Sequence, residues 1–171
     1  MKNNILFILL FTSTFIFSQH INTRFIAVDK GATEKFEKGV AKKTKTFNSK
    51  EGQLRFYTFF VNTGSNMGNY MRVRYEDEMK GFDINPSKEA MKLWNSEVSD
   101  VMTNMDGRMQ SLNKNASHVV VSPFSKPLRT VMEYTYKGGM SDEFWRFRNN
   151  VAKAVKESGA DIFMEVWGCG S

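Results

Sequence analysis

Apolar and polar residues follow each other along the chain in a repeating order of strand-like and helix-like segments. Residues 24–28 and 54–61 are rich in β-branched and aromatic side chains, which predicts two strands. Between them, apolar side chains recur at helical spacing over residues 33–47 and predict an amphipathic helix. Residues 69–76 alternate with a period of two, which is typical of a partly exposed strand.

A long helix and a last strand are predicted further along. The helical stripe consists of Met91, Trp94, Val98, Val101, Met102, Met105, Met109 and Leu112. It predicts one helix over residues 87–112, and the β-prone residues 117–122 follow it. The order strand, helix, strand, strand, helix, strand over residues 23–122 is the split βαβ arrangement of ferredoxin-like folds, so the predicted class is α+β.

A weak internal duplication relates residues 23–65 to residues 130–171. Each copy has a β-prone run, a glycine turn, a helix with an acidic first turn, and a second β-prone run. We therefore predict a linker at 123–129 and a partial second repeat at 130–171. The alternative is that any two strand-helix-strand units look alike. Since the second copy stops after three elements, we expect the sequence to be a fragment of a longer product.

The predicted strand at 56–61 reads Phe-Tyr-Thr-Phe-Phe-Val and is apolar at both parities. A strand with one face in water alternates, so this pattern indicates a sheet covered on both faces. Helices cover one face, and we expect a second sheet on the other, from a homodimer partner or a completed repeat. The alternative is a hairpin whose outer face carries bulky residues by chance.

The first eighteen residues have the layout of a secretory signal peptide. Lys2 supplies the positive start, residues 5–17 carry no charge, and Ser18 offers a small residue at the cleavage point. The apolar stretch is shorter than the roughly 20 residues that span a bilayer. We therefore expect export to the periplasm or the extracellular space, with no stable membrane anchor after cleavage.

Composition excludes several kinds of chemistry. The chain of 171 residues has a formal net charge of +6, two histidines and one cysteine. Its basic residues are dispersed, which argues against nucleic-acid binding, and the triplet Lys42, Lys43 and Lys45 is interpreted as a solvated helix face. Cys169 has no second cysteine to pair with, and the usual four-ligand zinc site cannot be assembled. Phosphate-loop and dinucleotide motifs are absent from the sequence, so we expect no cofactor or metal.

Two matching segments carry a resemblance to a known family: residues 30–36 (Lys-Gly-Ala-Thr-Glu-Lys-Phe) and 137–144 (Lys-Gly-Gly-Met-Ser-Asp-Glu-Phe). Each follows a β-prone run and begins a helix. In this respect the chain resembles the dimeric α/β-barrel superfamily, and its antibiotic-biosynthesis-monooxygenase-like members most of all. The resemblance implies sheet-to-sheet packing of two ferredoxin-like units. Members include cofactor-independent oxygenases, haem enzymes and non-catalytic ligand binders.

Two functions are compatible with these features. The first is an exported protein that binds a small apolar or aromatic ligand, or acts in assembly, without catalysis. The alternative is a cofactor-independent, monooxygenase-like enzyme acting on an aromatic substrate, which needs an acid-base pair or hydrogen-bond donors in its pocket. The candidate pocket residues are His118, Trp94, Tyr70 and Arg72. Because polar candidates are few, binding is favoured over catalysis.

Overall fold

The structure is a computed structural model that describes residues 19–120 and 128–169. The predicted signal peptide at 1–18 and residues 123–127 of the predicted linker lie outside the described residues. Within the described part of the chain, no helix has both the length and the apolar character needed to cross a bilayer.

The first half of the chain forms a four-stranded antiparallel sheet with two helices. The elements are β1 (His20–Val28), α1 (Thr33–Phe47), β2 (Tyr57–Phe60), β3 (Tyr70–Glu76), α2 (Lys88–Glu97) and β4 (Met102–Leu112), with short 3₁₀ helices at Met79–Asp83 and Ser99–Val101. The strand order is β2-β3-β1-β4, and each neighbouring pair is antiparallel. Strand β3 therefore lies between β1 and β2, which is the split βαβ order of a ferredoxin-like fold.

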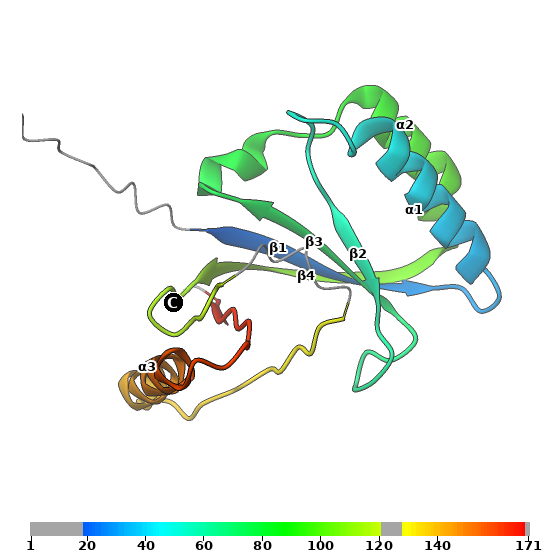
Figure 1. The fold of residues 1–171 in the computed structure, drawn as a ribbon. Coiled ribbons are helices and arrows are strands. Elements are labelled where there is room, and N and C mark those ends of the chain that lie inside the picture. Colours follow the sequence, from blue (N-terminus) through cyan, green and yellow to red (C-terminus); the bar gives the residue numbers. More distant parts are fainter. Residues whose placement is uncertain (1–18, 121–127, 170–171) are drawn as a thin grey trace, which may run out of the picture.

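Both helices of this unit cover the same face of the sheet. Helices α1 and α2 lie side by side over it (Figure 1). The apolar core between them and the sheet consists of Ile26, Phe36, Tyr70, Val98 and Val101. Gly39 allows the close approach of the two helices, because a Cβ at this position would lie 2.7 Å from the backbone oxygen of Glu97.

The predicted helix over 87–112 is wrong beyond Glu97. Helix α2 ends at Glu97, and residues 102–112 form β4, which pairs with β1 from His20 opposite Ser111 to Val28 opposite Met102. The methionine stripe fits a helix locally, but β1 has a second edge whose backbone groups need partners. Pairing along the whole of β1 outweighs the local helical pattern, and Gly107 in the middle of the segment weakens a helix further.

The C-terminal part differs from the predicted second repeat. The expected helix forms as α3 (Ser141–Ser158) and ends at Gly159, which adopts the left-handed conformation with φ of 66°. The predicted strand at 131–136 does not form, and these residues are exposed. Residues 162–167 provide only an isolated bridge at Met164 and the start of β5 (Trp167–Gly168), which extends the first sheet beside β4. The duplication therefore stays a prediction.

The predicted final strand at 117–122 is also reduced in the described residues. His118 makes a single bridge to Met164, and residues 121 and 122 lie outside the described part. A chain that has already added β4 and β5 to the sheet leaves no edge next to β1 for this segment. The C-terminal segment lies below β1 and β4 in Figure 1, where β5 pairs with the edge of β4.

The second sheet expected over the far face is not formed by the described residues. Strand alternation places Tyr57 and Phe59 of β2 on the far face, and both are half-buried. Part of the far face is covered by the C-terminal segment, where Trp167 packs edge-on against Tyr75 at 5.7 Å between ring centroids. A homodimer partner that covers the rest stays a prediction.

Candidate functional site

A row of basic side chains faces the helices from the two central strands. Strand alternation places Arg24 of β1 and Arg72 of β3 on the same face as the core residue Ile26, and the two arginines are directly opposite each other. Arg74 is the next residue of β3 on this face and lies opposite Asn22. Like charges directly opposite on neighbouring strands are destabilising, so this pairing is unfavourable for the fold by itself.

Lys43 adds a fourth cation from the helix side. It lies on the sheet-facing stripe of α1, seven residues after the core residue Phe36, and is only 2% exposed. Its Nζ atom lies 4.9 Å from the ring centroid of Phe56 and 5.7 Å from that of Trp94. The same atom donates a hydrogen bond of 3.0 Å to the side-chain oxygen of Asn48.

Arg72 shares the two aromatic rings with Lys43. Its guanidinium carbon lies 4.7 Å from the ring centroid of Phe56 and 4.9 Å from that of Trp94. Nη1 donates a hydrogen bond of 2.6 Å to the Thr58 hydroxyl. Nη2 is buried and donates to no described atom, although the residue is only 5% exposed. A buried polar atom without a partner is uncommon in folded proteins, and it leaves one donor of Arg72 available.

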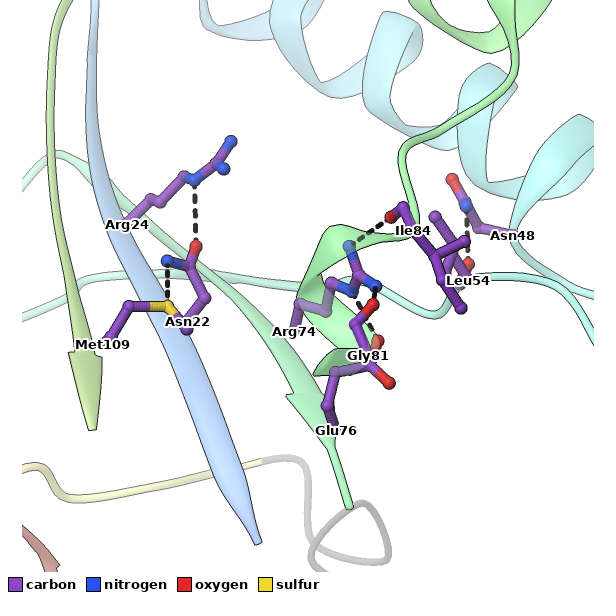
Figure 2. A network of polar contacts seen from close by, with 9 residues as sticks. All are labelled: Asn22, Arg24, Asn48, Leu54, Arg74, Glu76, Gly81, Ile84 and Met109. Atoms are coloured by element: carbon purple, nitrogen blue, oxygen red, sulfur yellow. Dashed lines mark hydrogen bonds and ion pairs between the residues drawn. The ribbon is translucent and has the colours of Figure 1, made fainter. Parts of the chain in front are cut away.

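Arg74 is fully partnered, in contrast to Arg72. Its Nε atom donates to Glu76 at 2.5 Å, Nη1 donates to the backbone oxygen of Ile84 at 3.0 Å, and Nη2 donates to that of Gly81. Figure 2 shows the guanidinium pointing into the 3₁₀ turn that follows β3. Arg74 therefore fastens the connection between β3 and α2, and its charge is balanced by the Glu76 carboxylate.

Arg24 extends from β1 into the space on the helix side of the sheet and is exposed (Figure 2). Its Nε atom donates a hydrogen bond of 3.0 Å to the Asn22 side chain, whose Nδ2 atom in turn donates to the sulfur of Met109 at 2.9 Å. Gly107 of β4 lies opposite Arg24, and a Cβ there would lie 3.2 Å from the Arg24 side chain. The glycine therefore leaves room beside the base of this arginine.

Positive charge is in excess on this face. Among the described residues, no carboxylate forms an ion pair with Lys43, Arg24 or Arg72. The Glu76 carboxylate is paired with Arg74. Burial, and then the Arg72 charge, lowers the pKa of Lys43 to about 8. Burial, and then the Arg24 charge, lowers the pKa of Arg72 to about 10. Both shifts have the direction expected for cations held together away from water.

An open groove lies beside this group of cations. It lies between α1 and the edge strand β2 and has a volume of about 610 Å³. The lining residues are Val40, Ala41, Thr44, Lys45, Ser49, Phe56, Tyr57, Thr58 and Phe59. Two of them, Phe56 and Thr58, contact Arg72 directly. The apolar wall of the groove and the buried cations therefore meet at Phe56 and Thr58.

Three of the four residues predicted from the sequence lie on the helix side of the sheet. Arg72 and Trp94 are in contact. Tyr70 is two residues before Arg72 on β3, but it belongs to the apolar core, where it packs on Phe36 and its hydroxyl donates to Glu37 at 2.7 Å. His118 is elsewhere: its backbone exchanges hydrogen bonds of 2.8 and 2.9 Å with Met164, so it ties the C-terminal segment down.

Lys43 and Phe56 were not predicted as members of the site. Lys43 was interpreted as part of a solvated helix face, and this is wrong, because it is buried while Lys42 and Lys45 are exposed. The available signal was its position in the apolar stripe of α1, three residues after Val40. Phe56 was included in a predicted strand, but it precedes β2 and turns its ring toward the helices.

Comparisons with known proteins give little more. No family model matches the chain, and no curated protein does either. One similar solved structure is an uncharacterized NIPSNAP-like domain protein from Burkholderia xenovorans, with a TM-score of 0.40 and 9% sequence identity, covering 67% of this chain and 95% of that chain. Similarity at this level assigns neither a family nor a function, so the assignment of the fold rests on the strand order described above.

Proposed function

We propose that this protein binds a small organic anion with an aromatic or apolar body in the groove between α1 and β2. The observation that carries the proposal is Arg72. It is buried between two aromatic rings, lies opposite another arginine, has no carboxylate partner among the described residues, and keeps one buried donor without an acceptor. A cation in this position gains a partner when an anion binds.

The charge of the site selects the class of ligand. Lys43, Arg24 and Arg72 come from α1, β1 and β3. The Arg24 charge acts on the Arg72 guanidinium, and the Arg72 charge acts on the Lys43 amine. A carboxylate is the preferred partner of a guanidinium because two of its oxygens match two parallel N–H donors. In a site screened from water by Phe56 and Trp94, such a bond is stronger than it is at the surface.

The lining of the groove indicates that the part of the ligand beyond its carboxylate is apolar. The apolar lining includes Val40 and Ala41 on α1 and Phe56 before β2. Small-molecule sites are commonly apolar clefts in which a few polar groups fix the orientation of the ligand. We therefore expect an aromatic or alkyl carboxylate, with the apolar part in the groove and the carboxylate at Arg72. The signal peptide predicted at 1–18 leads us to propose that binding takes place after export.

The proposal is tested with benzoate as the anionic probe and benzamide as its neutral counterpart of nearly the same shape. Isothermal titration calorimetry with the full chain should show saturable binding of benzoate and much weaker binding of benzamide. Arg72→Met should weaken benzoate binding at least tenfold, since it removes the buried donor and one charge. Arg146→Met removes the same charge from an exposed position on α3 and should leave binding unchanged.

Equal binding of benzoate and benzamide would mean that the groove recognises only the apolar body, and the proposal of an anion site would then be wrong. The same conclusion follows if Arg72→Met, shown to be folded by its circular dichroism spectrum, binds benzoate as tightly as the unmodified protein does. Because benzoate is the smallest aromatic carboxylate, phenylacetate and phenylpropionate complete the series. Their affinities should rise with length as more of the groove is filled.

A further inference from the structure

The amine of Lys43 differs from the other lysine amines of α1. Lys42 and Lys35 are exposed and form ion pairs with Glu97 at 2.6 Å and with Asp100 at 2.5 Å. Lys43 is buried, contacts two aromatic rings, and has no carboxylate partner among the described residues. A lysine that is desolvated and placed beside another cation is the recognised arrangement for a nucleophilic amine.

The protonation state of Lys43 agrees with this arrangement. A lysine attacks a carbonyl carbon only when its amine is neutral, and an ordinary lysine is almost entirely charged near neutral pH. Burial, followed by the Arg72 charge, lowers the pKa of Lys43 from 10.5 to about 8. With that pKa, roughly one fifth of the amine is neutral at pH 7.4, compared with about one part in a thousand for an ordinary lysine.

The environment also holds the amine in place. Asn48 accepts a hydrogen bond from Nζ of Lys43 at 3.0 Å. Its own Nδ2 atom donates to the backbone oxygen of Leu54 at 2.6 Å (Figure 2), so the amide is fixed at both ends. Lys43 and Arg72 both contact the rings of Phe56 and Trp94, and the Arg72 charge acts on the Lys43 amine. A ligand whose carboxylate is bound by Arg72 has its adjacent carbon atoms near Nζ.

We propose that Lys43 forms a reversible imine with a 2-oxo acid whose carboxylate is bound by Arg72. This inference rests on the proposed function, because it requires the anion site to be real, and it goes further by naming the ligand class. A 2-oxo acid carries its carbonyl directly next to its carboxylate, which suits a guanidinium and an amine that contact the same two aromatic rings.

Formation of the imine requires no oxidant, reductant or other co-reactant. The neutral Lys43 nitrogen bonds to the carbonyl carbon, a proton passes from that nitrogen to the former carbonyl oxygen, and a carbinolamine forms. Loss of this oxygen as water, after it takes up a second proton from the solvent, leaves a protonated carbon–nitrogen double bond. Hydrolysis reverses the sequence. Borohydride reagents trap the imine by adding hydride to its carbon, which reduces it to a stable secondary amine.

The test uses the full chain with phenylpyruvate and sodium cyanoborohydride at pH 7.4, followed by proteolysis and mass spectrometry of the peptides. We expect the reduced adduct on Lys43, with at least tenfold lower occupancy on the exposed Lys42 and Lys45, which are matched controls in the same helix. Phenylacetone has the ketone but lacks the carboxylate and should label Lys43 much less. Arg72→Met should lower Lys43 labelling by phenylpyruvate to the level of the exposed lysines.

Equal labelling of Lys42, Lys43 and Lys45 would overturn the inference, because it would show ordinary surface chemistry. The anion site and the imine fail in different ways. Benzoate binding in the calorimeter measures the anion site alone, because benzoate has no ketone, whereas the reduced adduct at position 43 measures the imine. If the unmodified protein binds benzoate but gives no Lys43 adduct, the imine is wrong and the anion site stands. If benzoate does not bind, the anion site is wrong as well.

Discussion

Substituting Arg72 and Arg74 in turn distinguishes an arginine that binds a ligand from an arginine that stabilises the fold. They lie two residues apart on β3, face the same side of the sheet, and are 5% and 7% exposed. Only Arg74 has a carboxylate partner, in Glu76. Replacing each by methionine keeps most of the volume and removes the charge.

The magnitudes follow from the contacts of each residue. The pKa of Arg72 lies at about 10 instead of 12.5, which corresponds to roughly 3 kcal/mol of destabilisation of its charged form. Against this stand the hydrogen bond to Thr58, about 1 kcal/mol, and two cation–π contacts of about 0.5–2 kcal/mol each, part of which a methionine sulfur over the same rings retains. Arg72→Met should therefore leave the free energy of unfolding within about 1 kcal/mol of its original value.

Arg74→Met should be far more damaging. It leaves the Glu76 carboxylate without its cation and two backbone oxygens, of Gly81 and Ile84, without their donor. Removing one partner of a buried pair typically costs about 3–5 kcal/mol. For a chain of this size, a loss of about 3 kcal/mol lowers the melting temperature by roughly 6–12 °C.

Urea denaturation followed by circular dichroism at pH 7 measures both variants, without added ligand. The expected result is a gap of at least 2 kcal/mol between them, with Arg72→Met near the unmodified protein. A loss for Arg72→Met as large as that for Arg74→Met would refute the reasoning. It would show that Arg72 stabilises the fold through its own contacts. Its lack of a carboxylate partner among the described residues would then not indicate a ligand site.

Two further predictions concern the helix layer. Because the pKa of Lys43 is lowered to about 8 from 10.5, the unfolded chain binds the additional proton between these values, and the free energy of unfolding should rise with pH from about 8 to 10.5. Urea titrations at several pH values should show a shallower rise for Lys43→Met, and identical slopes would contradict the assignment. Gly39→Ala should destabilise the protein by about 1–3 kcal/mol despite the better helix propensity of alanine, since its Cβ would lie 2.7 Å from the Glu97 oxygen. Gly138→Ala, with open space around the new methyl group, should be close to neutral in the same melts.

Local patterns in the sequence were enough to predict most of the first unit. The strand at 24–28 is the central part of β1, the helix at 33–47 matches α1, and the alternating run at 69–76 matches β3. The secondary structure of these segments follows from their hydrophobic periodicity, because one face of each packs on a single core. The order of elements, and hence the ferredoxin-like class, was predicted correctly, although residues 102–112 were assigned to a helix and the last strand was placed at 117–122 instead.

The later elements depended on pairing that no local pattern reveals. Residues 102–112 have a helical stripe of methionines and still form β4, because β1 needs a partner along its second edge. Residues 131–136 are as β-prone as those of β1, but in the described chain they have no neighbouring strand and stay exposed. A strand exists only when another segment satisfies its backbone, and this is a property of the whole fold.

The candidate site was also predictable from the sequence only in part. The sequence by itself determined that Arg72 and Tyr70 share one face of a strand, since alternation requires it, and it marked Trp94 on a helix. Only the tertiary structure brought Lys43 from α1 and Phe56 from the segment before β2 against Arg72, and placed Arg24 opposite it. The physical reason is that charge excess is a sum over neighbours in space, while the sequence records only neighbours along the chain.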